Sequence, residues 1–488
     1  MKKLNNFIKA EQLLNNYSLY EDNKIFSNYF TIKINDDYRP EGQKIFNISY
    51  FLIPLSEDKF SYNKGEELFL KENYFIYHGD KVFYPFFVHP LTEGHLKKWI
   101  SNKYKFVEAD KSIYIGTVMS SFRSLLVLNK NTNKYFIAKM SLFNNIANGS
   151  RHIDWNSAIG QYESCQIVKE SLKNEKRIDF FEDIGAFGMT GDNSAYLSNK
   201  FKIVIGSRKI KTFGLIIRKI PKEFFRDKDN IIVSFASLTS LCKSESNYLS
   251  NMYSSSKKKF LNFFETEVFQ PIFILLMDIF TKFGILLENH AQNLLIELDS
   301  NYKPTGKYFY RDFDLITLER ARFPFYKYDM WIDYKKDRSD RITLKSNLEM
   351  RDNIGITFFS HFLGNIIYAC IQSSIKQGFI TKKEGKKYLY QKECYIKEML
   401  MCELPKFNKN FKYKKWKPMK DFFSDIFKNE IPVNLKIIDK NNIDFSVYDN
   451  VILSRKYKSI DNFYISEDRK FIIGVKNDIV INLMSMSK

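Results

Sequence analysis

The chain has 488 residues, which is too long for one small domain and predicts two or three lobes. Hydrophobic residues make up 44% of it and aromatic residues 16%, which excludes a chain that is disordered as a whole. The formal charge of +20 comes with lysines scattered along the whole length, so we expect solvated faces and no nucleic-acid partner. A positive field still favours anionic substrates such as ATP and polycarboxylates.

Three further features bear on compartment and metal content. The five cysteines form no CxxC pair and no zinc spacing, which is typical of buried thiols in a reducing compartment. The start, Met1 to Asn6, is basic but lacks the apolar core of a signal peptide, so we expect a cytoplasmic protein. The longest apolar run, 268–287, contains Pro271, Asp278 and Lys282 and therefore predicts a buried helix and no membrane segment.

In chain order, the predicted elements indicate an α+β protein. Residues 1–80 mix short helical and strand-like pieces and carry no usable motif. A mixed α/β region follows, and the polar segment 243–259 then predicts a loop or lobe junction. The strands expected are 81–90, 112–116, 124–128, 134–142, 201–205, 212–217, 294–298 and 307–310. The helices expected are 93–101, 157–171, 260–288 with a kink at Pro271, 354–377 and 382–401.

The last two strands predict a β-hairpin that gathers polar side chains at one end. Between them lies 299–306, a segment rich in Gly, Pro, Asn and Asp. If the turn is centred on Tyr302 and Lys303, Asn293 falls opposite Asp312, because opposed residues in an antiparallel ladder keep a constant index sum. Amide and carboxylate oxygens at one edge suit Mg²⁺ and phosphate. The residues expected at this edge are His290, Gln292, Asn293, Asp312 and Asp314.

Two earlier segments offer cations for an anionic ligand. Lys139 and Arg151 flank a strand end and a Gly-containing bend, and two cations in one pocket can hold phosphate and carboxylate groups. Surface charge at a strand end is the alternative. Ser121 and Arg123 have groups that donate to phosphate, although a solvated loop is the simpler interpretation. His89 before Pro90 is ambiguous between a site and a core residue, and His361 and the other isolated histidines receive no role.

Taken in order, these motifs resemble those of the NRPS-independent siderophore synthetases, the aerobactin synthetase family. Glu288, His290, Gln292 and Asn293 match every defined position of the family's Glu-x-His-x-Gln-Asn segment, and Arg311-Asp312 matches its Arg-Asp pair. The resemblance covers about residues 80 to 405. The other similar segments are Phe87 to Thr92, Ser121 to Ser124, Lys139 to Arg151 and Lys397 to Leu404.

The resemblance implies a hand-shaped α+β fold with a thumb, mixed α/β fingers and a largely helical palm that contains the hairpin. The corresponding regions are 1–80 for a short thumb, 81–245 for the fingers and 246–488 for the palm. It also implies a ligase that uses ATP and Mg²⁺ to adenylate a polycarboxylate, citrate or a related acid, for attack by an amine or alcohol. A homodimer stays open, although no interface pattern stands out.

Expected roles follow from the same resemblance, residue by residue. His290, Arg151 and Lys139 are expected to be catalytic, in the phosphate and carboxylate region. Glu288, Asn293 and Asp312 are expected to bind Mg²⁺. The residues expected to bind ATP are Ser121, Arg123, Lys139, Gln292, Asn293 and Asp312.

Departures from the family pattern keep other functions open. Ala147 stands where the family has Thr, and Cys402 stands where it has a late Arg, so the acid and the activity itself are open. A kinase-like phosphotransferase is the second hypothesis, but such enzymes normally carry an Asp base before the Asn and a glycine-rich loop, and neither is evident. The third hypothesis is a non-catalytic family member or a basic nucleic-acid-binding protein.

Overall fold

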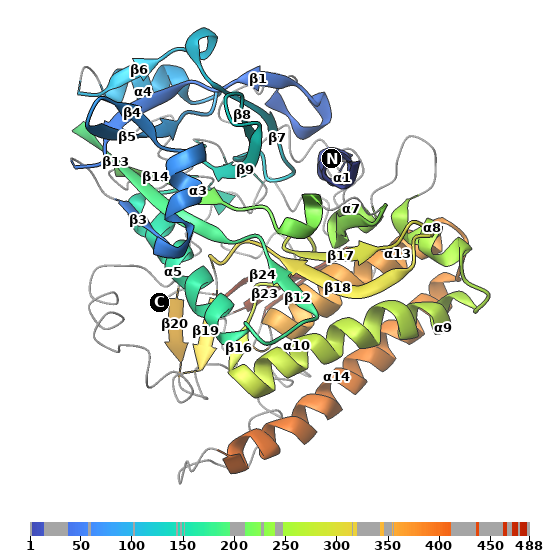
Figure 1. Ribbon diagram of the computed structural model, residues 1–488. Helices are drawn as coiled ribbons and strands as arrows, with labels where there is room; N and C mark the ends of the chain where they lie inside the picture. Colours follow the sequence, from blue (N-terminus) through green and yellow to red (C-terminus); the bar gives the residue numbers. More distant parts are fainter. Residues whose placement is uncertain are drawn as a thin grey trace. The chain divides into compact units, whose positions relative to one another are not determined.

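The computed structural model divides the chain into two compact units, Met1–Tyr395 and Ile396–Lys488 (Figure 1). Helices and sheets are mixed along the described chain, which confirms the α+β class. The described residues are 2–13, 38–56, 60–100, 103–142, 145–146, 149–150, 152–195, 210–225, 229–239, 247–314, 316–319, 342–345, 354, 356–410, 436–438, 462–465, 471–476 and 479–485.

A seven-stranded sheet, antiparallel throughout, is the largest sheet described in the first unit. The strands predicted at 112–116, 124–128, 134–142 and 212–217 are confirmed with shifted ends, whereas 201–205 lies outside the described residues. In sheet order the strands are β1 (Ile45–Asn47), β7 (Tyr114–Val118), β8 (Ser124–Asn129), β9 (Lys134–Lys139), β14 (Ile210–Arg218), β13 (Asp183–Ala195) and β3 (Phe60–Tyr62).

Strand β13 is not among the predicted strands, although it pairs with both β14 and β3. Its glycines at 185, 188 and 191 weaken the strand signal, because Gly has no side chain to pack and is depleted in strands. Ile184, Phe187 and Met189 nevertheless point into the core and are fully buried. Tertiary packing therefore overrides a weak local preference in this strand.

Helix α5 (Trp155–Ser171) packs against β13 and β14 and confirms the predicted helix 157–171. Asp154 caps it, since its Oδ1 accepts from the Ser157 backbone N–H at 2.6 Å. Close packing against β14 depends on Gly214, where a Cβ atom would lie 2.4 Å from the Asp154 carbonyl oxygen and 2.8 Å from the Ala158 Cβ.

A second, four-stranded antiparallel sheet shares one aromatic core with the first, through side chains such as Tyr74, Phe87, Phe136 and Phe187. His89 is buried beside this core, and its Nδ1 accepts from the Leu91 backbone N–H at 3.2 Å, which makes it a core residue. The elements here are β4 (Ile76–His78), β5 (Lys81–Phe87), β2 (Tyr50–Pro54), β6 (Lys105–Val107), α3 (Glu67–Asn73) and α4 (Glu93–Ile100).

The predicted hairpin forms, in a third sheet of order β12-β18-β17-β15, but its register differs by one residue. The turn closes at Asp299, whose backbone N–H donates to the Lys303 carbonyl at 2.8 Å. A bulge between Ile296 and Leu298 then shifts the register of the strands. Arg311, and not Asp312, therefore stands opposite Asn293. The strands are β12 (Ile178–Phe180), β15 (Ile231–Ser234), β17 (Leu294–Leu298) and β18 (Pro304–Tyr310).

The long helix predicted at 260–288 forms in three pieces and ends early. A π-helical segment precedes Pro271, and Gly284 ends the helix with a left-handed φ of 67°, as is common at helix C-termini. Residues 285–286 form β16 (Ile285–Leu286), which pairs with β19 (Ile316–Glu319) and through it with β20 (Ile342–Lys345). The helical pieces are α9 (Phe260–Phe264), η6 (Glu265–Phe269) and α10 (Gln270–Phe283).

The segment 243–259, predicted to be a loop, contains helix α8 (Tyr248–Ser254) among its described residues. Asn247 and Ser250 form a reciprocal capping box at the start of α8, and the prediction of a loop does not take this helix signal into account. The late helices are confirmed as η7 (Ile356–Ile367), α13 (Tyr368–Lys376) and α14 (Lys382–Asn410). No helix within the described ranges is both long and apolar enough to cross a membrane.

In the second unit, the described strands form an antiparallel four-stranded sheet in chain order. These strands are β21 (Lys436–Ile438), β22 (Asn462–Ile465), β23 (Phe471–Lys476) and β24 (Ile479–Ser485).

We predict that Gly214→Ala destabilises the protein by about 1–3 kcal/mol, because the added methyl group overpacks the contact between α5 and β14. Gly94→Ala is the matched control: it lies exposed in α4 with no atom within 4 Å of a Cβ, and Ala favours the helix. Urea unfolding measures both. A Gly214→Ala midpoint equal to that of the wild type would show that the helix is not packed this tightly.

Candidate functional site

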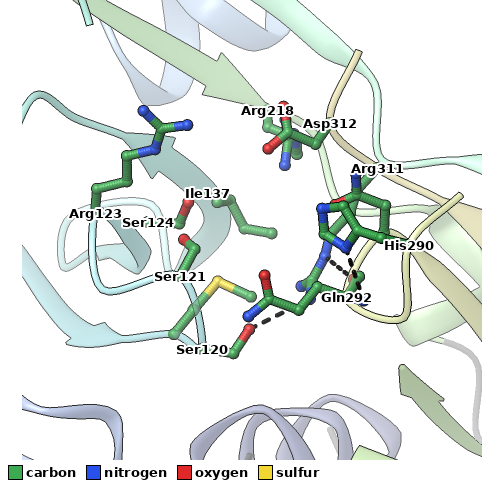
Figure 2. A pocket seen from close by; sticks show the side chains of 12 residues that line it. Ser120, Ser121, Arg123, Ser124, Ile137, Arg218, His290, Gln292, Arg311 and Asp312 are labelled. Atoms are coloured by element: carbon green, nitrogen blue, oxygen red, sulfur yellow. Dashed lines mark hydrogen bonds between the residues drawn. The ribbon is translucent and has the colours of Figure 1, made fainter. Parts of the chain in front are cut away.

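A pocket opens where one end of the seven-stranded sheet meets the end of the hairpin, within the first unit. About 500 Å³ of space free of protein atoms lies between its walls, and part of this space is open to solvent. Figure 2 shows the β7–β8 turn across the pocket from His290, Gln292 and Arg311. The lining residues are Met119, Ser120, Ser121, Arg123, Ser124, Ile137, Arg218, His290, Gln292, Asn293, Arg311 and Asp312.

The β7–β8 turn supplies hydroxyl groups and a guanidinium. Its backbone is closed by the Phe122 N–H donating to the Met119 carbonyl at 2.9 Å, and Phe122 adopts a left-handed φ of 61°. Bulky residues rarely hold this conformation, and such strain is often found at ligand sites. Ser121 Oγ is buried and, among the described residues, has no hydrogen-bond partner. The turn therefore offers a donor whose hydrogen bond a ligand can complete.

Lys139 and Asp312 form an ion pair that joins strand β9 to the end of the hairpin, with the lysine buried and the aspartate partly exposed. Lys139 Nζ lies 2.6 Å from Asp312 Oδ1, and the lysine is only 1% exposed. Burial lowers the pKa of Lys139 to about 8 against the opposing charge of Asp312. For Asp312, burial would raise the pKa, but the charges of Lys139, Arg218 and Arg123 together hold it well below its usual value. Asp312 stays an anion, with a left-handed φ of 72°.

A series of buried hydrogen bonds, which the sequence does not predict, continues from this ion pair to Arg218. Lys139 Nζ also donates to Gln161 Oε1 at 2.7 Å, and Gln161 Nε2 donates to Asp183 Oδ2 at 3.0 Å. Arg218 Nε then donates to Asp183 Oδ1 at 2.6 Å. Arg218 lines the pocket beside Asp312 (Figure 2), so it adds a guanidinium to the site.

The carboxyl groups of Asp312 and Asp314 lie close enough to Glu288 to affect its charge. Burial, and then the negative charges of Asp312 and Asp314, raise the pKa of Glu288 to about 8. A divalent cation would offset this repulsion, so the residues fit Mg²⁺. No three His, Cys, Asp or Glu side chains in the described ranges form a metal site by themselves, so phosphate oxygens would have to complete the coordination.

The loop between β16 and β17 is braced by its own polar groups and by the π-helix η7. Asn293 Nδ2 donates to the Glu288 carbonyl at 3.0 Å, and the His290 carbonyl accepts from the Asn293 backbone N–H at 2.9 Å. From η7, Asn365 Oδ1 accepts from the Ala291 backbone N–H at 2.9 Å. His361, one turn earlier, packs edge-to-face on His290 with ring centroids 5.9 Å apart. His361, given no role from sequence, thus lies beside the site.

The N-terminal helix α1 (Lys2–Leu13) also reaches the pocket wall, although the sequence offers no motif there. Arg311 donates through both terminal nitrogens to Glu11, at 2.7 and 2.9 Å, and through Nε to the Gln292 carbonyl at 3.0 Å. Ser120 Oγ donates to the same glutamate at 2.7 Å. Nothing in the local sequence around Glu11 distinguishes it from a solvated helix residue.

Of the residues expected at the site, most converge. Ser121, Arg123, His290, Gln292, Asn293 and Asp312 line the pocket, Lys139 contacts Asp312, and Glu288 lies within reach of the Asp312 charge. Arg151, expected to be catalytic, lies outside the described residues, and so does Ala147.

Comparison with known proteins supports the fold. No protein-family model and no curated protein sequence matches the chain. Among solved structures, the chain is similar to the ATP-bound aerobactin synthetase IucA from a hypervirulent pathotype of Klebsiella pneumoniae, with 13% identity, 75% of this chain and 64% of that chain covered, and a TM-score of 0.54. The chain is also similar to aerobactin synthetase IucC from the same pathotype, with 13% identity, 77% of this chain and 66% of that chain covered, and a TM-score of 0.53. For the petrobactin biosynthesis protein AsbB from Bacillus anthracis str. Sterne, the identity is 14%, 86% of this chain and 69% of that chain are covered, and the TM-score is 0.58.

The chain therefore shares the fold of these synthetases, as the sequence resemblance predicts. It spans about two thirds of the length of each of them. At this level of identity, the likeness concerns the fold and leaves the chemistry to be argued from the site.

We predict that the protein loses stability as pH falls from 6.5 to 4. Burial lowers the pKa values of His89 and His361 from 6.5 to about 4, so the unfolded chain binds more protons in this window and is favoured as pH falls. Each histidine contributes a slope of up to about 1.4 kcal/mol per pH unit. His361→Phe should flatten the slope, whereas the exposed His78→Phe should not. Denaturant unfolding at several pH values measures this, and equal slopes in wild type and His361→Phe would contradict it.

Proposed function

We propose that the pocket binds Mg·ATP and that the chain is an ATP-dependent, siderophore synthetase-like ligase. The main support for this proposal is that Arg123, Arg218 and the Ser121 hydroxyl line the same pocket as Asp312. Asp312 is in turn paired with Lys139. An anionic ligand needs such cations and donors, and a divalent cation bound with it needs carboxylates nearby. The fold shared with ATP-bound aerobactin synthetase IucA supports the same assignment.

The proposed reaction has two steps. A carboxylate oxygen of citrate or a related polycarboxylate attacks the α-phosphorus of ATP, pyrophosphate leaves, and an acyl-adenylate forms. An amine or alcohol then attacks the acyl carbon, loses its proton, and displaces AMP. The first step converts a poor electrophile into one with a good leaving group, which makes the second step possible.

The chain's own residues hold and orient the anions in this proposal. Ser121, Arg123 and Arg218 would contact phosphate oxygens, and His290 with Arg151 would contact the carboxylate. Lys139 would hold Asp312 in place while lending positive charge to the phosphate region. Glu288, Asn293 and Asp312 would hold Mg²⁺, and the hydrogen bond from Asn293 Nδ2 to the Glu288 carbonyl supports the loop that carries both residues. When bound, Mg²⁺ supplies positive charge that stabilises the triphosphate and the pyrophosphate leaving group.

We further propose that 1–80, 81–245 and 246–488 act as the thumb, fingers and palm of a hand-shaped synthetase. Residues before 81 also supply β1, β2, β3 and β4, so the first two regions share both sheets of the aromatic core. A homodimer remains part of the proposal on the sequence resemblance alone.

The experiment that tests the function is a hydroxamate-trapping screen. Purified protein, ATP, Mg²⁺ and hydroxylamine are incubated with a panel of di- and tricarboxylates, and the nucleotide products are separated. We expect a hydroxamate, AMP and pyrophosphate with at least one acid. Release of ADP would instead support the kinase-like alternative. Binding of Mg·ATP with no turnover for any acid would support a non-catalytic protein.

We predict that His290→Ala and Arg151→Ala each lower hydroxamate formation by about 10- to 100-fold, since each loses a charge-assisted contact of about 1.5–3 kcal/mol. His78→Ala, an exposed histidine in β4, is the matched control and should behave as wild type. The melting temperature of each variant is recorded alongside. Wild-type turnover in both site variants would refute the assignment of the acid-binding residues.

A further inference from the structure

We propose that Glu11 is a positioning residue that fixes both walls of the pocket at once, and that nucleotide binding depends on it. This inference rests on the proposed function, since it concerns the same pocket. Glu11 lies on α1, outside the region that carries motifs, and it does not line the pocket itself. It acts through Ser120 and Arg311, which do.

The contacts of Glu11 reach two segments far apart in the sequence. Its carboxylate accepts hydrogen bonds from both terminal nitrogens of Arg311 at 2.7 and 2.9 Å, which makes a bidentate pair with fixed geometry. The same carboxylate accepts from Ser120 Oγ at 2.7 Å. Arg311 follows the hairpin, and Ser120 belongs to the β7–β8 turn. One side chain thus ties the two sides that Figure 2 shows facing each other.

Burial makes this connection stiff. Glu11 is 1% exposed and Arg311 is 7% exposed, so water cannot readily replace either partner. Helix α1 is held independently by Lys3, which forms an ion pair with Glu297 on β17, and by Gln12, whose Nε2 donates to Thr117 Oγ1 on β7 at 2.8 Å. Phe7 packs on Phe181 and Phe224 within one core cluster. Helix α1 also packs against β15 and against α7 (Phe235–Thr239), which Figure 1 shows next to it. The helix is therefore a fixed base from which Glu11 acts.

The consequence for the site passes through Arg311. Its backbone N–H donates to the Asn293 carbonyl at 3.1 Å and its Nε to the Gln292 carbonyl at 3.0 Å. Asp312 follows directly, in the left-handed conformation that aims it at Lys139. If Glu11 no longer holds the guanidinium, Arg311 is free to turn toward the pocket. The hairpin end, with Asp312 and the 290–293 loop, then loses its support.

The test compares Glu11→Gln with a matched control on the same helix, Gln12→Ala. Glu11→Gln keeps the shape but removes the charge that holds Arg311. Gln12→Ala removes two buried hydrogen bonds to β7, to Thr117 Oγ1 and to the Val118 carbonyl, and neither of these two residues lines the pocket. We expect Mg·ATP affinity, measured by calorimetry, to fall about tenfold or more in Glu11→Gln and to stay at the wild-type value in Gln12→Ala. An equal loss in both variants, or no loss in Glu11→Gln, would overturn the proposal.

A second readout needs no nucleotide. Hydrogen exchange of the free protein should speed up in Glu11→Gln at the backbone amides of Phe122, Asn293 and Arg311, and should not do so in Gln12→Ala. If Glu11→Gln does not fold, Ser120→Ala replaces it and should speed up exchange at Phe122 while sparing Arg311. Unchanged exchange at these amides would overturn the role of Glu11. If wild type does not bind Mg·ATP, the proposed function fails, and the exchange comparison alone decides whether Glu11 orders the pocket walls.

Discussion

The site depends on the ion pair between the buried Lys139 and the partly exposed Asp312. Removing Asp312 would leave the buried charge of Lys139 without its partner, which would destabilise the fold. Here each partner has further support: Lys139 is held by Gln161, and the field of Arg218 and Arg123 favours the Asp312 anion. The pair fastens the hairpin end to the end of β9, the central strand of the seven-stranded sheet. That attachment brings Asp312 into one pocket with Arg123 and Arg218.

Charge balance explains how such a pocket could serve Mg·ATP. Burial, and then the negative charges of Asp312 and Asp314, raise the pKa of Glu288, and a divalent cation would offset those charges. Arg123 and Arg218 lie at the same pocket and suit phosphate oxygens. Both kinds of group are held by buried partners or by strained turns, as at Phe122 and Asp312. The site is therefore largely formed before any ligand binds.

Local patterns predict the parts of this structure that are built from neighbouring residues. The hairpin and its first strand follow from two apolar runs separated by a turn-rich segment, and the polar cluster from Glu288 to Asn293 stands directly before the first run. The register is off by one because a bulge and the Asp299 turn, which local propensity does not specify, decide it. Asp312 still reaches the pocket, because Arg311 turns to Glu11 and the next residue adopts a left-handed backbone.

Long-range partners escape such patterns. Gln161, Asp183 and Arg218 are separated by tens of residues and form a chain only after α5 packs on β13 and β14. Glu11 and His361 look like ordinary helix residues until the fold brings Arg311 and His290 to them. The Gly-rich strand β13 forms because β14 and β3 flank it, and no local signal marks it.

The most direct test of the account is carboxylate-dependent exchange of labelled pyrophosphate into ATP. Adenylation is reversible before the amine or alcohol is added, so the account predicts that label enters ATP only when a suitable acid is present. It also predicts that Lys139→Met abolishes the exchange. ATP consumption that releases ADP, with no label returning to ATP for any acid that is turned over, would contradict it.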